Sequence, residues 1–232
     1  MSGNMEYVFF NFASDKVLKD KSNILRLITR IVEESEFRVE ALFNDEYPPQ
    51  HFVENTPEEL SRAWDEAVAK GHYGASLGLW NSKEFALSVG VNFVHYRQFD
   101  VMVNSGNISD LMPSNYENVR QLVQVCEIVY SVLHPEYGFG LISPNIHPIT
   151  DPEEGEVTIQ AIYDYNFLGP RLVHKIGREK VLSIPTWRTI QFDDGGILLE
   201  MSPNPIADWK PYTSNYQKAT EILGVGKFYQ GG

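Results

Sequence analysis

The chain of 232 residues contains a single cysteine, Cys126, so it forms no intramolecular disulfide and offers no cysteine-rich zinc site. This scarcity fits a reducing compartment, and we expect the protein to be cytoplasmic. The first residues, MSGNMEYVFFNF, lack the basic segment and the sustained apolar run of a signal peptide. No apolar run approaches the roughly 20 residues that span a bilayer, so we expect no membrane interaction.

The sequence also lacks signatures of common metal and phosphate sites. It contains no H-E-x-x-H, no G-x-x-x-x-G-K-[ST] and no G-x-G-x-x-G. Cys126 falls on the apolar face of a predicted helix, where a thiol is a core side chain and a poor nucleophile. We therefore expect no catalytic residue, no metal ligand and no cofactor.

Basic residues are outnumbered: 19 lysines and arginines stand against 31 acidic residues, for a formal net charge of −12. Nucleic acid is an unfavourable partner, because phosphate binding needs a basic face. The charge favours a basic protein as partner, through electrostatic steering. The alternative is that it serves solubility alone.

The composition, with 43% hydrophobic residues, is typical of a globular protein. Apolar periodicity predicts helices over residues 22–34, 57–71, 114–134, 170–182 and 213–224, with Ser22 as the first cap and a weak point or kink at Gly177. Strands are predicted over 7–12, 37–43, 75–80, 85–93, 99–103, 138–142 and 157–165. Several strands meet through short turns, which favours an α+β fold with a largely antiparallel mixed sheet, or sheets, packed by helices.

A β-hairpin is the clearest local prediction. Residues 189–192 alternate polar and apolar side chains, so this strand should have one wet face. Residues 197–201 are almost continuously apolar, so this strand should be covered on both faces. The turn Asp193-Asp194-Gly195-Gly196 joins them, and two prolines in Ser202-Pro203-Asn204-Pro205 end the second strand.

We expect a single domain over residues 1–232, with a flexible tail at 225–232. A proline- and acid-rich segment near 143–156 is the best place for an internal division. Ser-Pro-Asn ends a predicted strand at 143–145 and again at 202–204. Two interpretations of this repeated tripeptide stay open: a duplication that makes two related sub-units, or coincidence.

Two surface features are candidates for partner binding. Four carboxylates within six residues form a negative patch that suits a basic partner: Asp151, Glu153, Glu154 and Glu156. Trp209 and Tyr212 lie in a loop after the final strand, where they would anchor a protein interface or cover the end of the sheet. The rival is an enzyme whose cleft uses His95 or His147 with a nearby carboxylate.

The C-terminal pattern resembles a known family. Trp187, a Gly-Gly pair, an apolar strand and a Ser-x-Asn-Pro stop precede a final helix, as in immunity proteins of polymorphic toxins of the immunity protein 52 group. The central order is similar too: Leu79-Trp80, a strand with Asn92, and a long helix ending at Leu133-His134-Pro135 before a glycine-rich strand. The resemblance covers residues 74–224 in outline, and its specific part, 195–205, is structural.

The resemblance implies a cytoplasmic α+β protein that neutralises a toxin by direct binding, and it transfers no catalytic or contact residue. Our leading hypothesis is therefore a non-enzymatic, immunity-type binding protein. The alternatives are an enzyme of unrecognised type and a homo-oligomeric scaffold.

Overall fold

The computed structural model describes residues 7–13, 20–43, 50–51, 56–69, 74–81, 85–92, 101–105, 116–143, 158–205 and 208–229. They form an α+β fold in which ten strands make one sheet, in the order β3-β2-β4-β5-β6-β1-β7-β8-β10-β9. Every neighbouring pair of strands in it is antiparallel, whereas the sequence predicts a largely antiparallel mixed sheet. The N-terminal part of the sheet is built from β1 Tyr7–Ala13, β2 Arg38–Phe43, β3 Gln50–His51, β4 Gly74–Trp80, β5 Ala86–Asn92 and β6 Val101–Ser105. The C-terminal part is built from β7 Tyr137–Ser143, β8 Tyr165–Leu168, β9 Arg188–Gln191 and β10 Ile197–Glu200.

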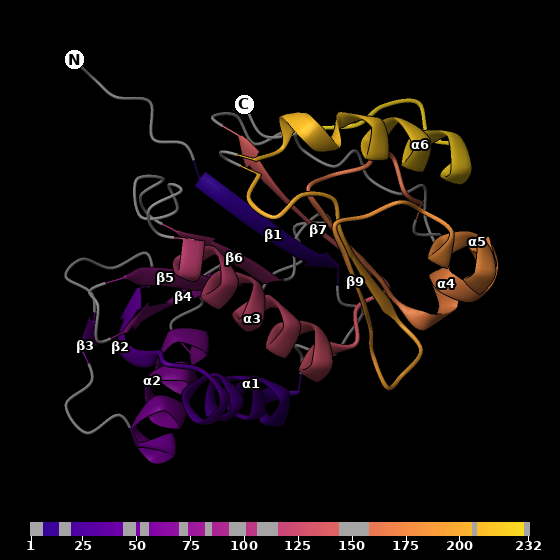
Figure 1. The fold of residues 1–232 in the computed structure, drawn as a ribbon. Helices are drawn as coiled ribbons and strands as arrows, with labels where there is room; N and C mark the ends of the chain where they lie inside the picture. The colour runs from indigo at the N-terminus through magenta and orange to yellow at the C-terminus, as the bar shows by residue number, and fades with distance from the viewer. Residues whose placement is uncertain are drawn as a thin grey trace.

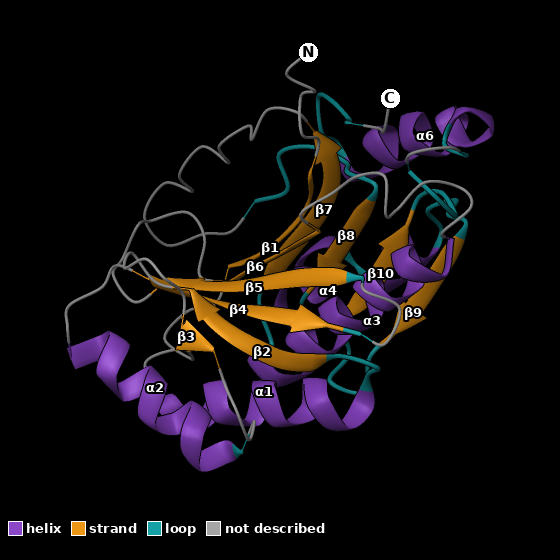
Figure 2. Ribbon diagram, turned by 90° about the vertical axis from the view of Figure 1, so that its left-hand side faces the viewer, coloured by secondary structure: helices purple, strands orange, loops and turns teal. Residues whose placement is uncertain are grey.

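The helices cover the two faces of this twisted sheet (Figures 1 and 2). Helices α1 Lys21–Glu34, α2 Pro57–Ala69 and α3 Tyr116–Leu133 share one buried core with side chains of β4, β5 and β6. Helix α3 packs its long apolar stripe on the sheet and runs nearly alongside β1 (Figure 1). A second core, built on the C-terminal strands, includes side chains of α4 Pro170–Ile176, α5 Arg178–Leu182 and α6 Thr213–Leu223. No helix among the described residues is long and apolar enough to cross a membrane.

The β9–β10 hairpin is confirmed. Strand β9 alternates half-buried and exposed residues, whereas all four residues of β10 are buried between β8 and β9. Strand alternation sends Leu198 to the first core and Leu199 to the second. Strand β10 therefore joins the two cores, and its side chains are fixed on both faces.

The turn of this hairpin is docked on the end of α3. Gly195 has a φ of 94°, which glycine adopts without strain. A Cβ on Gly196 would lie 1.7 Å from the Tyr130 hydroxyl, so only glycine fits there. Asp194 accepts hydrogen bonds from the Tyr130 hydroxyl at 3.2 Å and from the Gly196 amide at 2.9 Å, and it pairs with His134 Nδ1 at 3.1 Å. The Gly-Gly pair thus serves packing, in line with the structural role expected of it.

Two helix predictions need revision in detail. The first helix is capped by Asp20 and not by Ser22: its carboxylate accepts the Ser22 amide at 2.9 Å, because a short acceptor one residue before the helix reaches the free N–H groups. The weak point expected at Gly177 is a complete break into α4 and α5, with a φ of 98° that interrupts the helix.

The strand predicted over residues 157–165 is wrong, since β8 begins only at Tyr165. The Asn166 side chain bonds the amide and carbonyl of Tyr163, at 3.0 and 2.8 Å, and so closes a turn. Ile162 instead bonds the C-terminal segment, donating to the Lys227 carbonyl at 3.1 Å and accepting from the Tyr229 amide at 2.7 Å. The apolar alternation therefore reflects packing on this segment, and the expected flexible tail is hydrogen bonded at both of these residues.

Candidate functional site: a polar groove beside helix α3

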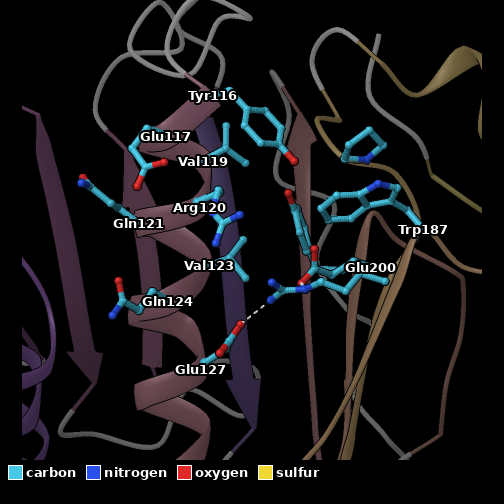
Figure 3. A pocket seen from close by; sticks show the side chains of 13 residues that line it. Tyr116, Glu117, Val119, Arg120, Gln121, Val123, Gln124, Glu127, Trp187 and Glu200 are labelled. Carbon is cyan, nitrogen blue, oxygen red and sulfur yellow. Dashed lines mark hydrogen bonds and ion pairs between the residues drawn. The ribbon is translucent and has the colours of Figure 1, made fainter.

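Helix α3 and the β9–β10 hairpin enclose a groove of about 320 Å³ (Figure 3). Its lining includes Tyr116, Arg120 and Glu127 from α3, and Trp187, Arg188 and Glu200 from the hairpin. Counting Glu117 as well, three glutamates and two arginines line it. The groove is therefore polar, and its formal charge is −1 when all five groups are ionised.

The α3 wall follows from helical spacing. Tyr116, Arg120, Val123 and Glu127 recur at i, i+4, i+7 and i+11, which places them on one face of the helix. The opposite wall follows from hairpin register, since Glu200 and Arg188 are directly paired across β9 and β10. The Trp187 amide donates to the Glu200 carbonyl at 2.9 Å, which fixes the backbone of Trp187 beside them.

One guanidinium joins the two walls. Arg188 donates from Nε to Oε1 of Glu200 at 2.7 Å and from Nη2 to Oε1 of Glu127 at 2.8 Å. The bond to Glu127 is the dashed line in Figure 3. These two nitrogens lie on one edge of the guanidinium, so both carboxylates are held side by side. Charge-assisted bonds of this kind are the stronger class of protein hydrogen bonds.

Burial raises the pKa values of the carboxyl groups of Glu200 and Glu127. The Glu200 side chain is only 4% exposed, and loss of water raises its pKa to about 7 although Arg188 opposes the shift. Burial likewise raises the pKa of Glu127, again against the effect of Arg188. One shared arginine therefore offsets only part of the cost of burying two carboxylates.

The rim carries further groups that can meet a ligand. Arg120 is exposed, and its positive charge opposes part of the rise in the pKa values of Glu127 and Glu200. Tyr116 is half-buried, and burial raises the pKa of its hydroxyl, with Glu200 and Asp208 contributing. The groove thus combines three aromatic side chains, those of Tyr116, Tyr165 and Trp187, with a charged, partly dehydrated floor, which suits binding of a polar or charged group.

The residues predicted to bind a partner fall into two groups. Asp151, Glu153, Glu154 and Glu156 lie outside the described residues. Trp209 is half-buried, with the Lys210 ammonium 5.6 Å from its ring centre, and Tyr212 packs against the second core. Asp208, next to Trp209, contributes to the raised pKa of the Tyr116 hydroxyl at the groove rim.

The histidines proposed for an enzyme, His95 and His147, also lie outside the described residues. Among the described residues, no histidine lines the groove and no cluster of His, Cys, Asp and Glu could hold a metal ion. Cys126 is buried as expected, which raises the pKa of its thiol well above the ordinary value. The pattern G-x-S-x-G does occur at residues 74–78. It lies inside β4, paired on both sides, and not at the strand-to-helix turn that exposes a nucleophile.

Sequence reasoning missed the groove, although one signal was present. Once the turn at 193–196 is placed, the register that pairs Ile197 with Gln191 also pairs Glu200 with Arg188. Glu127 gave no such signal, because its proximity to Arg188 depends on how α3 crosses the sheet.

Comparison with known proteins gives a likeness in fold. No protein-family model matches the chain, and no curated protein matches it significantly. Among solved structures it is similar to the Pseudomonas aeruginosa T6SS protein PA0821, with a TM-score of 0.57 and 11% identity. The match covers 95% of this chain and 76% of the other. At this identity the similarity shows the fold alone.

Proposed function

We propose that this protein binds another protein, and that it acts as an immunity-type inhibitor that neutralises a toxin by direct binding. The observation that carries the proposal is the groove beside α3, which combines Trp187 and Tyr116 with Arg120 at its rim. Tryptophan, tyrosine and arginine are the side chains that most often dominate the energy of protein interfaces.

Charge supports a basic partner. The chain carries a formal net charge of −12, which steers basic proteins toward it and slows the approach of acidic ones. The fold neighbour is described as a T6SS protein, which is compatible with a toxin-related role. A cytoplasmic location belongs to the same proposal.

The contact surface extends beyond the groove in this proposal. The loop with Trp209 and Tyr212 supplies a half-buried aromatic ring, and Asp208 in the same loop acts electrostatically on Tyr116 of the rim. The acidic residues of 151–156 add a negative patch for a basic partner. We assign these residues as secondary contacts.

The enzyme alternative has one observation in its favour, namely two carboxyl groups with raised pKa values in a groove. Acid–base catalysis, however, needs two carboxyl groups in environments that separate their pKa values. Glu127 and Glu200 instead share one guanidinium, which places both carboxyl groups in one environment. Binding is therefore the function that the geometry supports best.

Affinity capture from the cells that encode the protein tests the proposal, at low and moderate salt. We expect a stoichiometric, salt-sensitive protein partner. That partner, expressed alone in a heterologous host, should arrest growth, and co-expression of this chain should restore it. Capture of no partner contradicts protein binding, whereas a partner without toxicity contradicts the immunity role.

A further inference from the structure

We propose that the groove receives a basic side chain, arginine or lysine, from the partner protein and places its cation against Glu127 and Glu200. The inference rests on the proposed function, because the bound protein carries the cation. It adds the chemistry of the contact and the two residues that recognise it.

The first observation is the unequal pairing at the floor of the groove. Arg188 bonds Oε1 of Glu127 and Oε1 of Glu200. Within the part of the chain that the structure describes, no other donor bonds these carboxylates, so the Oε2 atom of each can accept from a ligand. Arg120 lies near both but, among the described residues, hydrogen bonds to neither. Two carboxylates held side by side therefore share one guanidinium.

The second observation is that one of these carboxylates is buried at the edge of a cavity. Glu200 is 3% exposed, yet it lines a groove of about 320 Å³ (Figure 3). A second cation can form a charge-assisted hydrogen bond with such a carboxylate, and bonds of this class are stronger than neutral ones. An anionic ligand is disfavoured, because three glutamates stand against two arginines here and Arg188 is already engaged.

The walls suit the rest of a basic side chain. Trp187 and Tyr116 line the groove from opposite walls (Figure 3). Aromatic faces attract guanidinium and ammonium groups, and the apolar stem of arginine or lysine packs against them. The groove therefore offers contacts to both parts of the side chain.

Cation binding should strengthen as pH rises through neutrality. Burial raises the pKa of Glu200 to about 7, so part of the population is protonated there and attracts a cation less. The titratable and charged groups that act on this carboxyl come from three elements: Arg188 of β9, Tyr165 of β8, and Glu127, Arg120 and Tyr116 of α3. Burial also raises the pKa of Glu127. Its deprotonation therefore strengthens cation binding as pH rises, as that of Glu200 does.

The test is a titration of the full chain with N-acetyl-arginine amide and N-acetyl-lysine amide, followed by nuclear magnetic resonance. N-acetyl-citrulline amide serves as the uncharged isostere of arginine. The indole N–H signal of Trp187 is the reporter, identified by its loss in Trp187→Phe. We expect saturable shifts with at least one of the two cations, dissociation constants of about 1–10 mM, and no binding of citrulline.

Two variants of opposite sign make the result specific. Glu127→Gln should weaken cation binding about fivefold or more, whereas Arg120→Gln should strengthen it by removing a competing positive charge. Glu221→Gln, which removes an exposed glutamate of α6, is the matched control and should leave affinity unchanged. Binding of neither cation, equal binding of citrulline, or a Glu127→Gln affinity equal to that of Glu221→Gln overturns the inference.

Failure here is distinguishable from failure of the proposed function. If a captured partner binds Glu127→Gln as tightly as wild type, the basic side-chain contact is overturned and protein binding stands. If the groove binds the cations but the protein captures no partner, the proposed function is overturned and the cation site stands.

Discussion

Arg188 and Glu200 are direct cross-strand neighbours in the β9–β10 hairpin, with Nε of the arginine 2.7 Å from Oε1 of the glutamate. The same guanidinium reaches Glu127 on α3, so this pair also fastens the hairpin to the helix. Because Glu200 is almost fully buried, the pair sets both the stability of this region and the charge of the groove.

The pH dependence of stability is the first consequence. The pKa of Glu200 rises from 4.5 to about 7 in the folded protein, so between these pH values the folded state binds more protons than the unfolded state. The free energy of unfolding should therefore fall as pH rises through this window, by up to about 3 kcal/mol from Glu200. Urea unfolding between pH 4.5 and 7.5 measures it.

Glu200→Gln supplies the reference profile, because it keeps the shape and removes the titration. As pH rises from 4.5 to 7.5, the wild type should lose stability relative to Glu200→Gln, because only the wild type has a carboxyl group to deprotonate at this position. Parallel profiles for the two proteins would show that Glu200 titrates normally.

Removing the shared guanidinium should be costly. Arg188→Ala leaves Glu127 and Glu200 close together without their common donor, and we expect a loss of about 2–3 kcal/mol at pH 7. The loss should be smaller at pH 5, where the carboxyl groups can protonate. Arg171→Ala is the control, since that side chain is 83% exposed, and it should change stability by less than about 0.5 kcal/mol. Equal effects of the two substitutions would contradict a structural role for the Arg188 pair.

The close packing of the hairpin turn on Tyr130 leads to a separate prediction. Gly196→Ala should destabilise the protein by more than about 3 kcal/mol, because its Cβ would meet the Tyr130 hydroxyl. Tyr130→Phe removes that hydroxyl and should recover part of the loss in the double variant. Gly226→Ala has no neighbour within 4 Å and should be nearly neutral. Thermal unfolding of the four variants tests the turn, and a neutral Gly196→Ala would show that it is not packed on α3.

Local patterns predicted much of this fold, and the failures have physical reasons. The hairpin, Cys126 in the core and the weak point at Gly177 follow from alternation, helical periodicity and glycine, although the helix breaks completely at Gly177 instead of kinking. The strand expected at 157–165 fails because an apolar alternation is satisfied equally by packing on the distant segment at Lys227. The groove depends on the crossing of α3 over the sheet, and no spacing within one segment encodes that crossing.

The acidic segment offers a test of the wider contact surface. Charge reversal in the triple variant Glu153→Lys, Glu154→Lys and Glu156→Lys should weaken binding of a basic partner about tenfold at low salt, and less at high salt. A triple reversal at exposed positions elsewhere, Glu33→Lys, Glu66→Lys and Glu179→Lys, controls for net charge. Equal losses in the two triple variants would mean that net charge alone acts, and an unchanged affinity would remove this segment from the contact surface.

The most direct test of the groove as the partner-binding site is the affinity of the captured partner for wild type, Glu127→Gln and Glu221→Gln, measured by calorimetry at pH 7.5. We predict a loss of about tenfold or more for Glu127→Gln and none for Glu221→Gln. Equal affinities for all three proteins would contradict the assignment and place the contact surface elsewhere on the molecule.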